Sequence, residues 1–411
     1  MPSLPPAIAP IALARHRPFA LFWCARVAGT VAYQMQAVAI GWQVYELTGS
    51  ALELGFVGLV QFIPVAVLAL VVGHVADRFD RRGVVRACQL AEAIAAAVLA
   101  AGSAGGWLTE HAIFAIVFVI GTARAFELPA LHALLPGLVP PALFARAVAG
   151  SASANQLAII AGPALGGVLY AAGAGVVYAS AAALFLAAGA LVSAIRAAPA
   201  RAGTSATFAS LFAGLAFIRH QRVLLGAISL DLFAILLGGA TALLPIYARD
   251  ILHSGPWGLG LLRSAPAFGA LAASLLLARR PLSARAGRVM FASVACFGLA
   301  TMVFGVSTSL PISLAALAVL GASDATSVVI RFSLVQLATP DDMRGRVSAV
   351  NSLFIGTSNT LGEFESGVTA AWFGVVPAVV IGGIGTILVA LFGMRLFPEL
   401  LRVDTLERAS S

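Results

Sequence analysis

The chain has 411 residues, of which 60% are hydrophobic and only 10% are charged, and its formal net charge is +8. Soluble domains carry about 25% charged residues, so this composition excludes an ordinary soluble fold and indicates a polytopic membrane protein. The basic residues are spread over loops between apolar stretches, so we expect no nucleic-acid partner. Three cysteines lie far apart in separate apolar stretches, without metal-ligand spacing, and we expect no cofactor or metal.

Apolar stretches long enough to cross a bilayer, which takes about 20 helical residues, follow one another along the chain. Glycine, proline and charge divide them into twelve predicted helices: 18–46, 53–76, 84–105, 111–137, 142–171, 175–197, 222–249, 257–279, 287–306, 311–338, 343–373 and 377–397. We therefore predict an all-α polytopic fold with twelve transmembrane helices. Two of the stretches, 142–171 and 343–373, are long and rich in small residues, which leaves eleven or thirteen helices open.

The segments between and beyond these helices predict five parts. They are an N-terminal segment (1–17), a six-helix bundle (18–198), a linker (199–221), a second six-helix bundle (222–397) and a tail (398–411). The linker ends in an amphipathic run, which we interpret as a helix on the membrane surface; the alternative is an extension of the seventh helix. Arginines gather in the segments that share a side with both termini, which predicts that both termini are cytoplasmic.

The two predicted bundles resemble each other in sequence. At a constant offset of 200 residues, Pro140 and Arg146 fall on Pro340 and Arg346. Shared glycines and alanines are common in such a chain, but aligned Pro–Arg pairs in the same loop are not. A duplicated six-helix unit, and hence two pseudo-symmetric bundles, is the best explanation.

The loop between the second and third predicted helices holds five charges in the ten residues from Gly73 to Arg82. Topology accounts for Arg81 and Arg82, because cytoplasmic loops are enriched in basic residues. It does not account for Asp77, which points to a function for this loop.

This loop resembles the signature that the major facilitator superfamily keeps between its second and third helices. The matching residues are Gly73, Asp77, Arg78, Arg81 and Arg82. The segments 42–50, 340–347 and 362–367 look like the branch that contains the enterobactin (siderophore) exporter. The resemblance implies alternating access between two bundles, a cavity lined by helices 1, 4, 7 and 10, and export of a small organic molecule in exchange for protons. It also implies a bacterial inner-membrane protein, and a monomer is the default. The sequence has no nucleotide-binding loop, HExxH motif, nucleophile elbow or paired-cysteine metal site, so we do not expect an enzyme.

A second stretch resembles the motif associated with proton-coupled antiporters. Its residues are Gly162, Pro163, Gly166 and Gly167. The match is partial, because Ala149 and Ala158 stand where that motif has glycines. Close helix packing with no role in transport explains the glycines equally well.

Polar and charged residues inside membrane helices are costly, so they are candidates for function. The candidates for a substrate and proton cavity are Arg26, Gln34, Arg124, Glu127, Asp231, Asp324, Arg331 and Glu363. Arg124 and Asp324 occupy equivalent positions of the repeat with opposite charges. They could face each other across the cavity, as a pair or as contacts for substrate, or form an ion pair that only joins two helices.

Proton exchange needs a carboxylate whose proton affinity changes as its site dries, wets or pairs with arginine. Glu127, Asp231 and Asp324 are the candidates. Glu127 follows Arg124 by three residues, on the same helix face, so it could instead neutralise that arginine locally.

A gate is the predicted role of the charged loop. We expect Asp77 to lie beside Arg344 and Arg346 at the start of the eleventh helix when the cytoplasmic side is closed. Two other functions stay open: an importer or facilitator on the same fold, and a transport-inactive receptor or lipid-handling protein.

Overall fold

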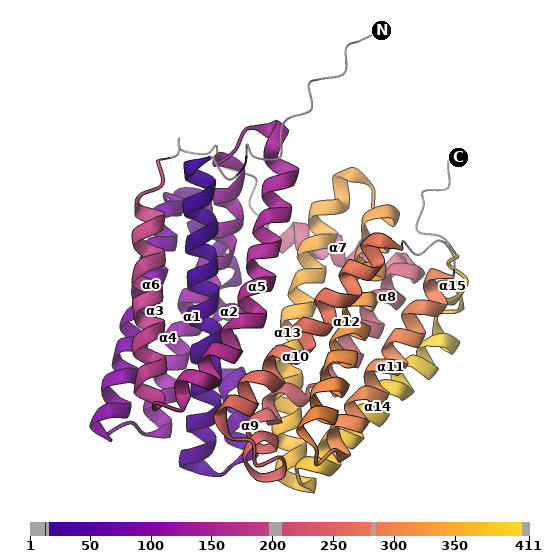
Figure 1. Ribbon diagram of the computed structural model, residues 1–411. Coiled ribbons are helices and arrows are strands. Elements are labelled where there is room, and N and C mark those ends of the chain that lie inside the picture. The colour runs from indigo at the N-terminus through magenta and orange to yellow at the C-terminus, as the bar shows by residue number, and fades with distance from the viewer. Residues whose placement is uncertain (1–12, 14–15, 197–207, 281–284, 405–411) are drawn as a thin grey trace.

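The computed structural model describes residues 13, 16–196, 208–280 and 285–404, and in these residues the chain is helical without strands. Two bundles of helices lie side by side, one from each half of the chain (Figure 1). The predicted all-helical membrane fold is therefore confirmed.

The first bundle contains α1 (Arg17–Thr48), α2 (Ala51–Arg78), α3 (Arg81–Gly105), α4 (Glu110–Leu134), α5 (Phe144–Tyr170) and α6 (Ala174–Ser193). Its turns are short because local signals end and begin the helices. Gly49 ends α1 in the left-handed conformation (φ 61°), and the hydroxyl of Ser50 accepts the backbone N–H of Glu53 at the start of α2. Thr109 caps α4 in the same way.

The second bundle contains α8 (Arg222–Leu237), α9 (Leu244–Ile246), α10 (Gly255–Arg279), α11 (Ala286–Val306), α12 (Leu310–Ala338), α13 (Asp341–Phe373), α14 (Val375–Leu396) and α15 (Pro398–Leu401). A separate helix, α7 (Phe208–His220), precedes α8 and packs against α13, where Ile218 lies in one apolar cluster with Val347 and Val350.

The seventh predicted helix is broken, which the sequence did not suggest. After α8 come Gly238 and Gly239, a 3-10 segment (Ala240–Leu243), α9 and a π-helical segment (Tyr247–Ile251). At Gly239 a Cβ atom would collide with the carbonyl oxygen of Gly362, so only glycine lets α13 approach here.

Ten of these crossings are long and apolar enough to span a membrane. The remaining two long helices, α1 with 32 residues and α13 with 33, are not among these ten. A total of twelve crossings stays a prediction that depends on these two.

The two bundles meet closely at one end of the molecule, the lower end in Figure 1. Helix α5 packs on α10, and α2 packs on α13. A Cβ atom on Gly167 would lie 3.0 Å from the Cα of Gly260, and one on Gly55 would lie 3.2 Å from the Cα of Gly367. This end lies where α1 and α5 finish and α10 begins, so the halves are closed together there.

Candidate substrate and ion-coupling site

One buried charge cluster lies within the first bundle. The Arg124 Nη1 donates to Glu127 Oε2 at 2.6 Å, and the Gln89 side-chain amide donates to the other carboxylate oxygen. The Arg124 guanidinium also lies 4.2 Å from the centre of the Tyr33 ring, in cation–π contact. The charge of Arg124 is therefore neutralised inside its own bundle.

Arg124 does not reach Asp324, which lies in the second bundle. The sequence left two partners open for Arg124, and the structure pairs it with Glu127 of the same helix. Proton exchange at Glu127 stays a prediction.

Glu92 was not among the predicted site residues; it lies on α3, three residues after Gln89. Glu92 is fully buried, and neither of its carboxylate oxygens has a hydrogen-bond partner among the described residues. The Nε of Arg26 is likewise buried without a partner there. The sequence could have identified Glu92, because it is a charged residue inside the predicted membrane helix 84–105, and Glu127 was selected for the same reason.

A second buried cluster joins three helices of the second bundle. Arg331 of α12 donates from Nη1 to Asp231 Oδ2 of α8 at 2.9 Å, and to Asn351 Oδ1 of α13 at 3.2 Å. The side chains of Arg331 and Asp231 are only 3% and 4% exposed. The structure thus brings two predicted site residues together and adds Asn351.

A cavity of about 320 Å³ lies between the bundles. Its walls come from α5, the broken seventh crossing, α10, α11, α12 and α13, and are apolar except for a few side chains. Those are Gln156, Thr241, Asp324 and Asn359. Small-molecule sites are typically concave and apolar with a few placed polar groups, and this cavity has that character.

Glu363 lies where the first bundle, α13 and the broken crossing meet. Its Oε1 accepts a hydrogen bond from the Thr241 hydroxyl at 3.5 Å. A Cβ atom on Gly58 of α2 would lie 2.8 Å from the other carboxylate oxygen, so that glycine makes room for it. Glu365 instead accepts from Thr369 of its own helix at 2.7 Å.

The antiporter-like stretch of α5 lies at a junction of three helices. A Cβ atom on Gly162 would lie 2.6 Å from the Cβ of Gln34, and one on Gly166 would lie 2.8 Å from the Cα of Met35, both on α1. The next residue, Gly167, faces α10. Pro163 also faces α10, because its carbonyl oxygen would lie 2.5 Å from a Cβ on Gly260. These residues set how closely α5 approaches both neighbours.

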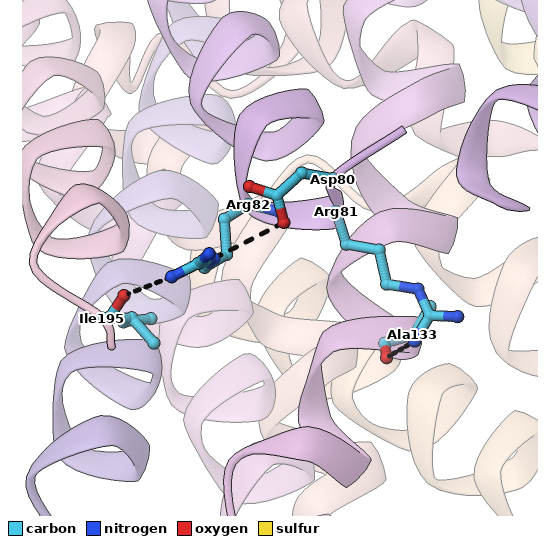
Figure 2. Close-up of polar contacts among 5 residues, drawn as sticks. All are labelled: Asp80, Arg81, Arg82, Ala133 and Ile195. Carbon is cyan, nitrogen blue, oxygen red and sulfur yellow. Dashed lines mark hydrogen bonds and ion pairs between the residues drawn. The ribbon is translucent and has the colours of Figure 1, made fainter. Parts of the chain in front are cut away.

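Two arginines of the charged loop bind helix ends within the first bundle. Figure 2 shows Arg81 donating to the Ala133 carbonyl and Arg82 donating to the Ile195 carbonyl, each at 2.9 Å. Asp80 lies 3.5 Å from the Arg82 Nε. Arginines near helix C-termini satisfy the last carbonyls and the negative end of the helix dipole, so this loop joins α3 to the ends of α4 and α6.

The structure leaves undescribed several residues of the proposed gate. It does not describe the surroundings of Gly73 or the side chains of Asp77 and Arg78. Arg344 is partly exposed, while Arg346 is exposed and donates to the Met343 sulfur at 3.4 Å. A contact between Asp77 and these arginines therefore stays a prediction.

A polar contact joins the two bundles at their closed end. The Tyr45 hydroxyl of α1 donates to Asp250 Oδ2 of the seventh crossing, and the Arg249 guanidinium lies 5.5 Å from the Tyr45 ring centre. A matched contact lies inside the first bundle, where Tyr170 donates to Glu46 at 3.1 Å.

We expect Tyr45→Phe to increase the fraction of molecules open at this end, because it removes a hydrogen bond between the bundles. Spin labels on Leu47→Cys and Trp257→Cys, in a background without the native cysteines, would show the longer distance population by electron paramagnetic resonance. Tyr170→Phe is the control and should leave the distances unchanged. Equal distances in Tyr45→Phe and the parent would contradict the assignment.

Comparison with known proteins gives the family. Residues 7–411 match the family model described as "Transmembrane secretion effector". The chain is 23% identical over 393 residues to macrolide efflux protein A of Streptococcus pyogenes, covering 91% of this chain and 94% of that protein. It is 27% identical over 405 residues to the enterobactin exporter EntS of Citrobacter koseri, covering 95% and 94%.

The fold also matches a solved structure. A bacterial homologue of the human lysosomal transporter Spinster, in an inward-facing and unoccupied conformation, superposes with a TM-score of 0.73 at 10% identity, covering 94% of this chain and 96% of that one. Family and fold are those of transporters and not of enzymes. The chain therefore belongs to the transmembrane secretion effector family of the major facilitator superfamily, and it is a multi-pass membrane transporter of the efflux type.

Proposed function

We propose that this protein exports a small organic molecule, drug-like or siderophore-like, across a bacterial inner membrane in exchange for protons. Alternating access between the two bundles would carry the molecule through the central cavity. The relatives support this substrate class, since one is named for macrolide efflux and another for enterobactin export. A cavity of about 320 Å³ between the bundles suits a small molecule.

Asp324 is the carboxylate that we propose to exchange the proton. Glu127 and Asp231 are already committed to arginines at 2.6 and 2.9 Å. Asp324 lines the central cavity and has no hydrogen bond or ion pair within 4 Å among the described residues. Of the three candidates, Asp324 is the carboxylate that lines the central cavity and has no arginine partner, and this observation carries the proposal.

The orientation follows from the arginine distribution, with both termini in the cytoplasm. The end closed by Tyr45 and Asp250 would then face outward, and the cavity would open to the cytoplasm, ready to load. The charged loop, through Asp77, Arg344 and Arg346, would close the cytoplasmic end in the next step. We propose that the protein works as a monomer.

The test is efflux from inverted vesicles or proteoliposomes driven by a pH gradient, with a panel of macrolides, dyes and siderophores. Asp324→Asn is expected to lower gradient-driven transport by at least about tenfold, a loss of about 1.4 kcal/mol or more in coupling, because the amide cannot carry the proton. Glu365→Gln is the matched control, since Glu365 binds its own helix, and it should transport normally. Undiminished gradient-driven efflux in Asp324→Asn would show that Asp324 is not the carboxylate that exchanges the proton.

A further inference from the structure

A second, much smaller cavity lies beside the central one, between α8, α11 and α12. Its volume is about 10 Å³, close to the space that one water molecule or one small ion needs. Five oxygen-bearing side chains line it: Asp231, Ser293, Ser323, Asp324 and Ser327. Asp324 also lines the central cavity, so the two spaces share this carboxylate.

One of these three serine hydroxyls is buried without a hydrogen-bond partner among the described residues. Ser327 is 3% exposed, and its hydroxyl has no hydrogen-bond partner among the described residues. Buried hydroxyls are normally satisfied, so an unpartnered one that lines a cavity of this size indicates that something binds there. Ser293 and Ser323 are also buried around the same space.

The charges around the cavity leave a negative excess. Asp231 and Asp324 contribute two negative charges and Arg331 contributes one positive charge, which gives a net charge of −1 when both carboxylates are ionised. Arg331 does not line the cavity, because its guanidinium is held by Asp231 and Asn351. The cavity therefore faces carboxylate and hydroxyl oxygens rather than the guanidinium.

The broken seventh crossing adds to this negative potential. Helix α8 ends at Leu237, and Ala234 and Ile235 in its last turn line the cavity. The C-terminal end of a helix carries a partial negative charge, and the ends of broken membrane helices coordinate Na⁺ in other transporter folds.

We infer that this cavity is a binding site for a monovalent metal cation, Na⁺, held by the carboxylates of Asp231 and Asp324 and the hydroxyls of the three serines. Proton exchange alone needs one carboxylate and no set of hydroxyls, so the site goes beyond the proposed function. Hard cations prefer oxygen ligands, and a space this small favours Na⁺ over the larger K⁺. Because Asp324 is shared, Na⁺ in the small cavity would hold the carboxylate that faces the substrate.

Binding of radioactive sodium to the purified full-length protein, by equilibrium dialysis at a fixed neutral pH, tests the site. Saturable binding that unlabelled Na⁺ displaces and K⁺ displaces poorly is expected. Ser327→Ala should weaken it by about tenfold, corresponding to one lost ligand, and Asp324→Asn should abolish it. The control is Ser333→Ala, because Ser333 lies on the same helix and donates to the Val329 carbonyl of that helix at 2.8 Å.

The outcomes separate this inference from the proposed function. Absence of saturable sodium binding in the parent protein, or parental affinity in Ser327→Ala with a parental melting temperature, overturns the cation site. Proton-driven efflux measured in sodium-free vesicles from the same preparations tests export independently. Efflux without sodium binding rejects only the cation site, and sodium binding without efflux in any assay supports the site and rejects only the export proposal.

Discussion

Replacing Arg331 with methionine is expected to lower the free energy of unfolding by about 3–5 kcal/mol, because it leaves Asp231 buried without its ionic partner. The pair is 2.9 Å apart and almost completely inaccessible, so water cannot replace the lost guanidinium. Asn351 would also lose the hydrogen bond that it accepts at 3.2 Å. Unfolding in mixed detergent micelles with increasing sodium dodecyl sulfate, followed by tryptophan fluorescence, measures the loss.

A double variant tests the physical reason. Asp231→Asn combined with Arg331→Met removes both charges, so it should recover more than half of the stability lost in Arg331→Met alone. Arg222→Met is the control for loss of an arginine, because Arg222 pairs with Glu399 at the surface and surface pairs contribute about 0–1 kcal/mol. A double variant no more stable than the single one would show that the unpaired carboxylate is not the cause.

Replacing Gly260 with alanine is expected to separate the bundles at their closed end. The new Cβ would lie 2.5 Å from the Pro163 carbonyl oxygen and 3.1 Å from the Gly167 Cα, so it meets backbone that no side-chain rotation can clear. Overpacking of this kind costs about 1–3 kcal/mol, and here the cost falls only on the state closed at this end. The equilibrium should move about tenfold or more toward molecules open there, with transport reduced accordingly.

The same spin-label distance between Leu47→Cys and Trp257→Cys reports the shift. Gly356→Ala is the control, since a Cβ there meets nothing within 4 Å, and alanine is a better helix former than glycine by about 1 kcal/mol. If Gly260→Ala keeps both the parental distance and the parental transport rate, then the contact between α5 and α10 does not set this equilibrium.

The fold was largely predictable, because the length of an apolar run in a membrane chain fixes where a helix can begin and end. The predicted stretch 257–279 differs from α10 by two residues, and Ser50 and Thr109 stand where capping residues are expected. The break after Leu237 was not predictable, because Gly238 and Gly239 in an apolar run are equally typical of close packing inside an intact helix. The approach of α13 decides between these, and only the three-dimensional structure shows it.

The same distinction applies to the candidate site: a contact within one helix could be predicted from the sequence, and contacts between helices could not. Arg124 and Glu127 are one turn apart on one helix, so their pairing could be expected from spacing. Asp231 and Arg331 come from different helices, and the sequence offered no reason to pair them rather than Arg124 with Asp324. Arg81 and Arg82 were predicted as topology and gate residues, but their binding of the ends of α4 and α6 depends on where those ends lie in space.

The break in the seventh crossing has a mechanical consequence. In a continuous helix, a tilt of one end also tilts the other end. Here Gly238 and Gly239, followed by a 3-10 segment, allow the two parts of the crossing to tilt separately. Beyond the break, Asp250 is bonded to Tyr45 of the opposite bundle; before it, Asp231 is bonded to Arg331. The chain can thus bend between these two contacts, so the contact between Tyr45 and Asp250 can break while the buried ion pair of Asp231 and Arg331 stays intact.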